Sequence, residues 1–263
     1  MTSYRPVTAA LRCLDVLMAV NRLRGRATVG EIHRHTEIDK STIVRMLETL
    51  AHAGFVIRDD DDPVYEVTGK SLLLSNGYDR HRAVGTIVTP IVTEFRDAIG
   101  WPSDVAIFDQ NAMMVVETSR QSGPFMLNRH PGYRAPILAT SLGLTYVAFT
   151  DETERRDILV QEAQIDAPWN SIAKDSGSAA TAFDAIRRLG YATMHPEYSR
   201  LEYANKISSI GVPINHGARV FATINVLFLK TVLPLEHAVA TLLEPLQAAA
   251  TRIGDELAQR SGS

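Results

Sequence analysis

One predicted helix, residues 40–53, presents side chains that could bind a nucleic acid. Its apolar residues recur at helical spacing and leave a polar face that includes Thr42 and Arg45. Lys40 and Ser41 at the helix start suit phosphate contact, and Arg45, one turn later, can reach the O6 and N7 atoms of a guanine. The alternative is a three-helix bundle whose polar face meets only water, and periodicity alone leaves both interpretations open.

A second set of polar residues, in the other half of the chain, could bind a small carboxylate. Thr140, Ser141 and Gly143 stand near a predicted helix start, where N–H groups and the helix dipole favour an anion. Ser209 and Asn225 interrupt apolar runs, and a buried polar group needs a partner, which a ligand can supply. Ser209 and Asn225 could instead hydrogen-bond to each other or to the backbone. The preceding loop offers positive charge from Arg129, His130 and Arg134.

Residue patterns for catalysis or metal binding do not occur in the sequence. There is no G-x-S-x-G nucleophile motif and no phosphate-cradling G-x-x-x-x-G-K motif, so we do not expect an enzyme. The single cysteine, Cys13, excludes an internal disulfide and a thiolate zinc cluster. His33 and His35 point to different helix faces, and the remaining histidines lack a second ligand at helical spacing. We therefore expect no metal and no cofactor.

Composition indicates an ordinary globular chain with an uneven distribution of charge. The 263 residues are 45% hydrophobic, the net charge is −3, and no apolar run approaches the length of about 20 residues that a membrane span needs. A cytoplasmic location without a membrane partner is expected. Up to Arg58 there are nine basic and five acidic residues, a net charge of +4, which leaves −7 for the remainder. A basic head on an acidic body suggests a polyanion-binding module joined to a second domain.

The polar face of residues 40–53 lies in a segment whose sequence predicts three helices followed by a β-hairpin. Helices are predicted over residues 9–23, 29–36 and 40–53, with Thr28 and Glu31 forming a capping box and Asp39 capping the third. On the first helix the following residues recur at the spacing of one apolar face: Leu11, Leu14, Leu17, Met18 and Val20.

Gly54 ends the third helix, and the runs "FVIR" and "VYEV" predict two strands. A helix-turn-helix followed by such a hairpin is a winged helix, which favours DNA binding. The turn of the hairpin, Asp59 to Asp62, consists of four carboxylates, which would be repelled by phosphate. We therefore expect readout to rest on the third helix and on basic residues nearer the N-terminus, among them Arg26, with the wing tip off the DNA.

Several motifs in this region resemble the DNA-binding domain of IclR-family transcriptional regulators. They are "ALRCLDVLMAV", "TVGEIHRHTEIDKSTIVRMLETLAHAGFVIRD" and "YEVTGKSLLLS", and the resemblance continues through nearly the whole chain. It implies an α+β protein with a winged helix-turn-helix domain over residues 1–68, a linker helix over 69–82 and a GAF-like α/β effector-binding domain over 83–263. From the residues, we expect the last domain to contain a mixed sheet flanked by helices, with "PFMLN" as one strand and "HPGYRAPILATS" as a loop.

The resemblance also assigns effector-binding positions. In relatives that bind small oxo-acids, an acidic position and the positions matching Ser209, Asn225 and Leu227 contact the ligand. The family's "D-x-E-E" stretch reads "LEYAN" here, so Glu202 takes the first acidic position. The two glutamates that follow in the family pattern are missing, which puts the role of Glu202 in doubt. The large Leu227 suggests a more apolar pocket.

An apolar pocket suits a small aromatic carboxylate better than glyoxylate or pyruvate. The stretches "WPSDVAIFD", "SLGLTYVAF" and "ISSIGVPI" are most similar to regulators of hydroxyphenylpropionate degradation. A regulator that senses an oxo-acid, and an architectural DNA-binding protein that senses nothing, remain alternatives.

Self-association is expected because one helix-turn-helix supplies too little specificity to find a single site in a genome. Symmetric heads would read double-stranded DNA at a pseudo-palindromic operator. The resemblance implies dimers or tetramers, and Leu72, Leu73 and Leu74 in the linker offer apolar surface for the contact.

Overall fold

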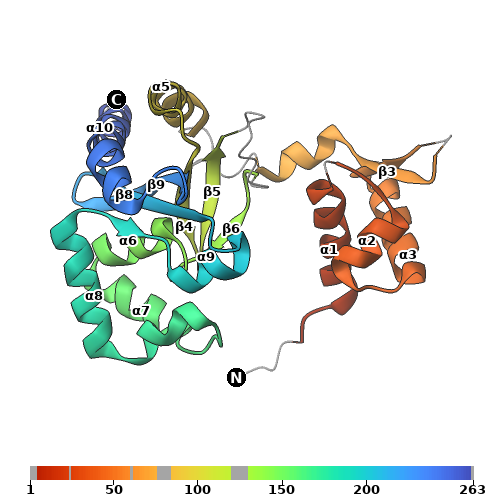
Figure 1. Ribbon diagram of the computed structural model, residues 1–263. Helices are drawn as coiled ribbons and strands as arrows, with labels where there is room; N and C mark the ends of the chain where they lie inside the picture. Colours follow the sequence, from red (N-terminus) through yellow and green to blue (C-terminus); the bar gives the residue numbers. More distant parts are fainter. Residues whose placement is uncertain (1–4, 24, 60–61, 76–83, 120–129, 262–263) are drawn as a thin grey trace. The chain divides into compact units, whose positions relative to one another are not determined.

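The chain forms two compact units, Met1–Asp79 and Arg80–Ser263, each with its own hydrophobic core (Figure 1). The structure is a computed structural model. It describes residues 5–23, 25–59, 62–75, 84–119 and 130–261.

The first unit is a helix-turn-helix with a small antiparallel sheet. Its elements are α1 (Thr8–Arg22), β1 (Arg26–Thr28), α2 (Val29–Thr36), α3 (Lys40–His52), β2 (Val56–Arg58), β3 (Val64–Val67) and the 3₁₀ helix η1 (Gly69–Ser75). The strand order is β1-β3-β2. The sequence predicts the β2–β3 hairpin but not β1, whose Ala27 pairs with Tyr65 on the free edge of β3.

Both predicted helix caps are confirmed, and they set where α2 and α3 begin. The Thr28 N–H donates to Glu31 Oε2 at 2.8 Å, and the Glu31 N–H donates to Thr28 Oγ1 at 3.3 Å, which completes the capping box. Asp39 Oδ1 accepts from the Thr42 N–H at 2.9 Å. Because both caps satisfy N–H groups at helix ends, they orient α3 relative to α2.

The predicted apolar face of α1 is only partly correct. Val16 and Val20 are fully buried against α2 and α3, whereas Leu11, Leu14 and Met18 are 50%, 56% and 47% exposed. The three exposed side chains recur at i, i+3 and i+7 and so lie along one side of the helix. In this small bundle α2 and α3 cover the opposite side of α1, which leaves this apolar stripe on the surface.

The predicted linker helix coincides only in part with described residues. The 3₁₀ helix η1 covers Gly69–Ser75, and Leu72, Leu73 and Leu74 on it are exposed. Residues 76–82 of the predicted helix lie outside the described part of the chain.

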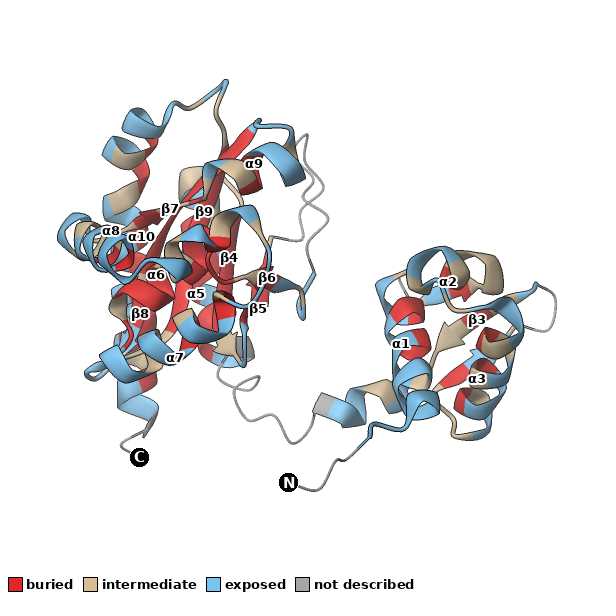
Figure 2. Ribbon diagram, turned by 90° about the horizontal axis from the view of Figure 1, so that it is seen from below, coloured by how far each residue is buried: buried red, intermediate tan, exposed pale blue. Residues whose placement is uncertain are grey.

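The second unit is a six-stranded sheet between two helical layers. Its elements are η2 (a π-helical turn, Val84–Val88), α5 (Thr89–Ile99), β4 (Ser103–Asp109), β5 (Ala112–Thr118), β6 (Arg134–Pro136), α6 (Ser141–Phe149), α7 (Glu152–Glu162), η3 (3₁₀, Pro168–Lys174), α8 (Ser176–Leu189), β7 (Ala192–Thr193), α9 (Pro196–Tyr203), β8 (Ile207–His216), β9 (Arg219–Leu229) and α10 (Leu235–Ser261). Helices α5 and α10 lie on one face of the sheet and α6 to α9 on the other (Figure 1). Figure 2 shows that buried residues concentrate on the strands between these layers.

The strand order is β6-β5-β4-β9-β8-β7, and every pairing in the described residues is antiparallel. The expected mixed sheet is therefore wrong in that respect, while the α+β class is confirmed. One local expectation also fails, because the predicted loop "HPGYRAPILATS" contains β6. Residues 196–203 form the helix α9, whose first position is a proline. The predicted strand "PFMLN" lies outside the described residues.

Candidate functional site

The N-terminal part of α3 presents two cationic side chains that are not engaged within the chain. Lys40 and Arg45 are exposed, and neither makes a side-chain hydrogen bond or ion pair with the described residues. Ser41 is also exposed, but its hydroxyl donates to Asp39 Oδ1 at 2.7 Å. Thr42 is half-buried beside them. All four predicted residues therefore lie together at one end of α3, with Lys40 and Arg45 available to an anion.

Asp39 modifies what the start of α3 can bind. Hydrogen bonds from Thr42 and then Ser41 hold the pKa of the Asp39 carboxyl well below its usual range, so it is ionised near neutral pH. Since the cap occupies the Thr42 N–H, less of the helix N-terminus remains for a phosphate. Lys40 is thus the stronger candidate for a phosphate contact than the backbone or Ser41.

Arg26, the other predicted DNA contact, has a different environment. Its guanidinium lies 3.0 Å from Asp59, 3.4 Å from Asp62 and 3.0 Å from Glu66. Three carboxylates of the hairpin therefore surround one arginine. In this arrangement Arg26 compensates the acidic turn, and its charge is already matched before any nucleic acid arrives.

The predicted residues of the second unit meet at the N-terminus of α6. Ser141 Oγ and Ser209 Oγ, from α6 and β8, are 2.7 Å apart, and both residues are buried. Thr140 caps the helix by accepting the Gly143 N–H at 3.2 Å. Of the alternatives for Ser209, pairing with Asn225 does not occur, because the partner of Ser209 is Ser141.

Two glycines allow α6 to pack closely, Gly143 against the segment that follows β6 and Gly211 against α6 from β8. A Cβ at Gly143 would lie 1.9 Å from the Ile137 carbonyl oxygen, and one at Gly211 would lie 2.8 Å from the Ser141 carbonyl oxygen. No side chain fits at either distance without moving the backbone. Gly143, which the sequence suggests as an N–H donor to a ligand, therefore has a packing role, and its N–H already binds Thr140.

Asn225 and Leu227 lie on the same face of the sheet as Ser209. Leu227 is opposite Ser209 and Asn225 is opposite Gly211 in the β8–β9 pairing. Asn225 Oδ1 accepts from the backbone N–H of Asp104 at 2.9 Å, as the backbone-bonded alternative for this residue predicts.

Two buried polar residues lie beside Asn225 that the sequence did not indicate as site residues. Asp104 and Thr118 are 2% and 3% exposed, and Thr118 Oγ1 donates to Asp104 Oδ1 at 2.6 Å. The sequence does contain a signal for one of them. Asp104 begins the apolar run "DVAIF", and strand alternation places its side chain on the same face as that of Ala106.

An aromatic cluster adjoins Leu227 and also escaped the sequence analysis. Tyr198 is buried in one cluster with Leu227 and Met194. Its hydroxyl lies 3.0 Å from that of Tyr133, and the Trp169 ring stands edge-on to it with centroids 5.3 Å apart. These residues come from α9, η3 and the segment before β6, so only the folded chain brings them together.

Three predicted effector residues are not part of this cluster. Arg134 is bonded to Asp109 and to Asn111, whose Oδ1 is 3.0 Å away, at the β4–β5 turn. Glu202 is exposed on α9. Arg129 lies outside the described residues.

In the described part of the chain, no three His, Cys, Asp or Glu side chains are grouped as metal ligands. Within the same residues, no helix combines the length and apolar character that crossing a membrane requires.

Two family descriptions match the chain. Residues 9–60 match the IclR helix-turn-helix domain, and residues 78–255 match the C-terminal domain of bacterial IclR transcriptional regulators. Together these segments include α3 and all the residues of the α6–sheet site.

Individual relatives are distant in sequence and similar in fold. The Pca regulon regulatory protein of Pseudomonas putida is 23% identical over 222 residues, which cover 84% of this chain and 74% of that protein. An IclR homolog from Microbacterium hydrocarbonoxydans, solved with 4-hydroxybenzoate, superposes with a TM-score of 0.71 at 20% identity over 95% of this chain and 98% of that one. HmgR of Pseudomonas aeruginosa gives a TM-score of 0.63 at 22% identity over 94% and 100% of the two chains.

Proposed function

Because the chain belongs to the IclR family of bacterial transcriptional regulators, we propose that it controls an operon for aromatic-acid catabolism and responds to a small aromatic carboxylate. The helix-turn-helix domain implies DNA binding, and family members are regulators rather than enzymes. The observation that carries the proposal is the aromatic cluster beside the hydroxyl pair at the start of α6. An aromatic wall with a few polar anchors is typical of a site for a flat, apolar acid.

The effector would lie beside the start of α6, next to Ser141, Ser209 and the aromatic cluster. Ser141 and Ser209 would exchange their mutual hydrogen bond for bonds to the carboxylate, assisted by the positive end of the α6 dipole. Tyr198 and Leu227 would contact the ring, and Asn225 would hold the neighbouring strand in place. Thr140, Gly143, Arg129, Arg134 and Glu202 would act through the surrounding structure or the rim.

The chemistry of the relatives points in the same direction. The IclR homolog from Microbacterium hydrocarbonoxydans was solved with 4-hydroxybenzoate, which is a small aromatic carboxylate. Hydroxyphenylpropionates and hydroxybenzoates are therefore the first ligands to test. Glyoxylate or pyruvate is the second candidate class, but the buried Leu227 and Tyr198 give such small polar acids little to contact.

DNA readout would rest on one face of α3. Arg45 would read a guanine in the major groove, Lys40 and Ser41 would contact phosphate, and Thr42 would lie against the groove wall. Arg26 would support the hairpin through its three carboxylates and contribute little to affinity. We assign these roles to a DNA-binding domain over residues 1–68 and the effector role to residues 83–263.

Two exposed apolar groups in the first unit support self-association. The α1 stripe of Leu11, Leu14 and Met18 and the η1 residues Leu72, Leu73 and Leu74 would otherwise meet water. A second copy would cover them and present two α3 helices to a pseudo-palindromic operator as a dimer, or two dimers as a tetramer. Light scattering should give a mass above that of one chain, and a Leu11→Glu/Leu14→Glu variant should lower it.

Isothermal titration tests the effector assignment. We expect heat with a phenylpropionate or hydroxybenzoate and a weaker response to glyoxylate and pyruvate. Ser209→Ala should weaken binding, whereas Ser208→Ala, one residue away and on the opposite face of β8, should not. No heat with any aromatic acid, or equal effects of the two variants, would contradict the assignment.

Anisotropy of labelled DNA from upstream of the chain's own gene tests the regulatory role separately. Addition of the effector should change the affinity, because switching requires different affinities for two states of the protein.

A further inference from the structure

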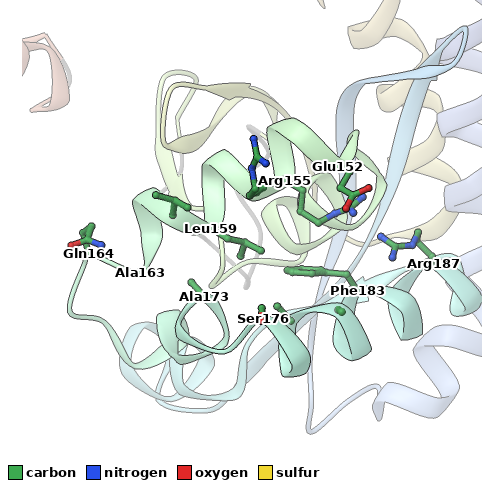
Figure 3. Close-up of a pocket in the computed structure, with 13 residues that line it drawn as sticks. Glu152, Arg155, Leu159, Ala163, Gln164, Ala173, Ser176, Phe183 and Arg187 are labelled. Atoms are coloured by element: carbon green, nitrogen blue, oxygen red, sulfur yellow. The ribbon is translucent and has the colours of Figure 1, made fainter.

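A second pocket lies in the outer helical layer of the second unit, away from the α6–sheet site. It has a volume of about 600 Å³ and opens between α7, η3 and α8. None of its lining residues belongs to the set around Ser141 and Ser209. Figure 3 shows Leu159 and Phe183 pointing toward each other across it, with Gln164 at one end and Arg187 at the other.

The chemistry of the walls changes along the pocket. Leu159, Ala173 and Phe183 provide an apolar floor, and Phe183 is only 1% exposed. Three arginines, Arg155, Arg156 and Arg187, also line the pocket, and Glu152 is the one acidic residue of the lining. The volume is in the range of small-molecule sites, roughly 300–1,000 Å³.

Arg155 and Arg187 are held close together by the end of α6. Arg155 Nε donates to the Val147 carbonyl at 2.8 Å, and Arg187 Nη1 donates to the Ala148 carbonyl at 2.7 Å. Arg155 Nη2 donates to the Thr150 carbonyl at 2.6 Å and also reaches Ala148 at 3.3 Å. Both guanidiniums therefore contact one carbonyl, and Arg155 Nη1 has no partner among the described residues.

This arrangement brings two like charges together, and the carboxylates of Glu152, Asp151 and Asp184 offset them only in part. Burial, followed by the charge of Arg187, lowers the pKa of the Arg155 guanidinium from its ordinary value. Arg187 is paired with Asp184, whereas the nearest carboxylate to Arg156 is Asp157, at 3.9 Å. An anion at this end of the pocket would offset the repulsion and could accept from Arg155 Nη1 and from Arg156.

We propose that this pocket binds a small amphipathic carboxylate, with its apolar body between α7 and α8 and its carboxylate at the arginine end. The site is independent of the effector site proposed above. A fatty acid of medium length or a naphthoate has the required chemistry.

Isothermal titration of the full chain with octanoate and with 2-naphthoate tests the proposal, with 1-octanol as the uncharged comparison. We expect one octanoate per chain in this pocket, weaker binding of 1-octanol, and binding of one 2-naphthoate that is retained in Ser209→Ala. Ala180 lines the pocket and is exposed, so the larger side chain of Ala180→Phe should fill part of the pocket and abolish carboxylate binding. Arg156→Gln should weaken it about tenfold, the loss of one charge-assisted hydrogen bond.

Two variants serve as controls for position and charge. Arg188→Gln removes an exposed arginine of α8 that does not line the pocket and should leave binding unchanged. Ser209→Ala alters the α6–sheet site and should also leave octanoate binding unchanged, so failure of the effector assignment would not imitate failure here.

The proposal is overturned if neither carboxylate binds, or if Ala180→Phe and Arg156→Gln bind octanoate as wild type does. Loss of octanoate binding in Ser209→Ala would overturn it too. Thermal melts of each variant verify that it is folded. A lower oligomer mass for Ala180→Phe together with no octanoate binding would assign the pocket to a second copy of the chain instead.

Discussion

The surface of α3 and the site at the start of α6 use polar side chains in opposite ways. On α3, Lys40 and Arg45 are exposed and have no partner within the described chain. At α6, Ser141 and Ser209 are buried, uncharged and bonded to each other. The difference is what the two proposed ligands require: a DNA backbone brings its own charge to a wet surface, whereas a small effector must be enclosed.

The charges on α3 have no partner within the described chain, whereas the hydroxyls at α6 are hydrogen-bonded to each other. Mutations at the two sites should therefore have different effects. A change on α3 removes an interaction that exists only in the complex, so the fold is unaffected. A change at α6 alters the free protein, because the same groups maintain its packing. The predictions below test this difference, beginning with the largest expected effect.

Gly143→Ala should be the most damaging single change. The added Cβ would lie 1.9 Å from the Ile137 carbonyl oxygen, and this backbone atom cannot move without displacing the segment before α6. We expect a loss of about 3 kcal/mol or more in the free energy of unfolding.

The matched control is Gly177→Ala in the first turn of α8, where the nearest atom is the Asp175 Oδ1 atom at 3.5 Å. It should be neutral or stabilising, by up to about 1 kcal/mol. Thermal unfolding followed by circular dichroism measures both. Equal melting temperatures for the two variants would contradict the packing role of Gly143.

Arg45→Ala should have the next largest effect, and on DNA binding alone. Loss of a bidentate contact to guanine should weaken operator binding by about 1–3 kcal/mol and relax the preference at one base pair. Arg26→Ala removes the same charge at a site already matched by three carboxylates, so operator affinity should change less than about twofold.

Anisotropy titrations at several salt concentrations distinguish these roles. A loss for Arg26→Ala as large as that for Arg45→Ala would show that Arg26 leaves the carboxylates to reach DNA. Both variants should melt at nearly the wild-type temperature, in contrast to Gly143→Ala.

The sequence predicted the α3 surface more completely than the α6 site. Caps and periodicity are local signals, so Thr28, Asp39 and the polar face with Arg45 could be recognised within a few residues of one another. The hydrogen bond between Ser141 and Ser209 joins residues 68 positions apart, and the contact of Tyr133 with Tyr198 spans 65. Residue types indicated that polar groups would be buried there, but pairing partners depend on sheet register and helix packing.

The prediction that the whole apolar face of α1 is buried failed for a related reason. Periodicity identifies an apolar face without indicating which surface covers it, and none of the residues that the structure describes in the first unit buries Leu11 or Leu14. Arg134 and Arg26 show the corresponding problem for charge. Each was a plausible anion ligand, and each is paired with carboxylates brought near by a strand turn.

Acid should weaken the α3 site through its N-cap. Because the pKa of the Asp39 carboxyl is lower in the folded chain than in the unfolded one, its contribution is present above the unfolded pKa of about 4 and is lost as the pH falls further. Asp39→Asn keeps a capping oxygen but does not titrate, so its stability should fall less steeply between about pH 5 and pH 2 than that of wild type.

Urea unfolding across this pH range, followed by far-ultraviolet circular dichroism, provides the test. Glu31, whose pKa is lowered by hydrogen bonds from Thr28, should account for part of the remaining slope. Identical slopes for wild type and Asp39→Asn would exclude Asp39 as a source of acid sensitivity.

The smallest expected effect concerns the hairpin, where the two kinds of site meet: an exposed surface whose charges are already paired. Replacing Asp59 and Asp62 by asparagine removes two of the three carboxylates around Arg26 and leaves Glu66, 3.0 Å away. Affinity for unrelated DNA should rise severalfold at low salt and converge with wild type as salt increases, because the change is electrostatic. The preferred operator sequence should not change, since only α3 would read bases. A changed preference would mean that the hairpin turn touches base edges, and the acidic turn would then be part of the readout rather than a surface held off the DNA.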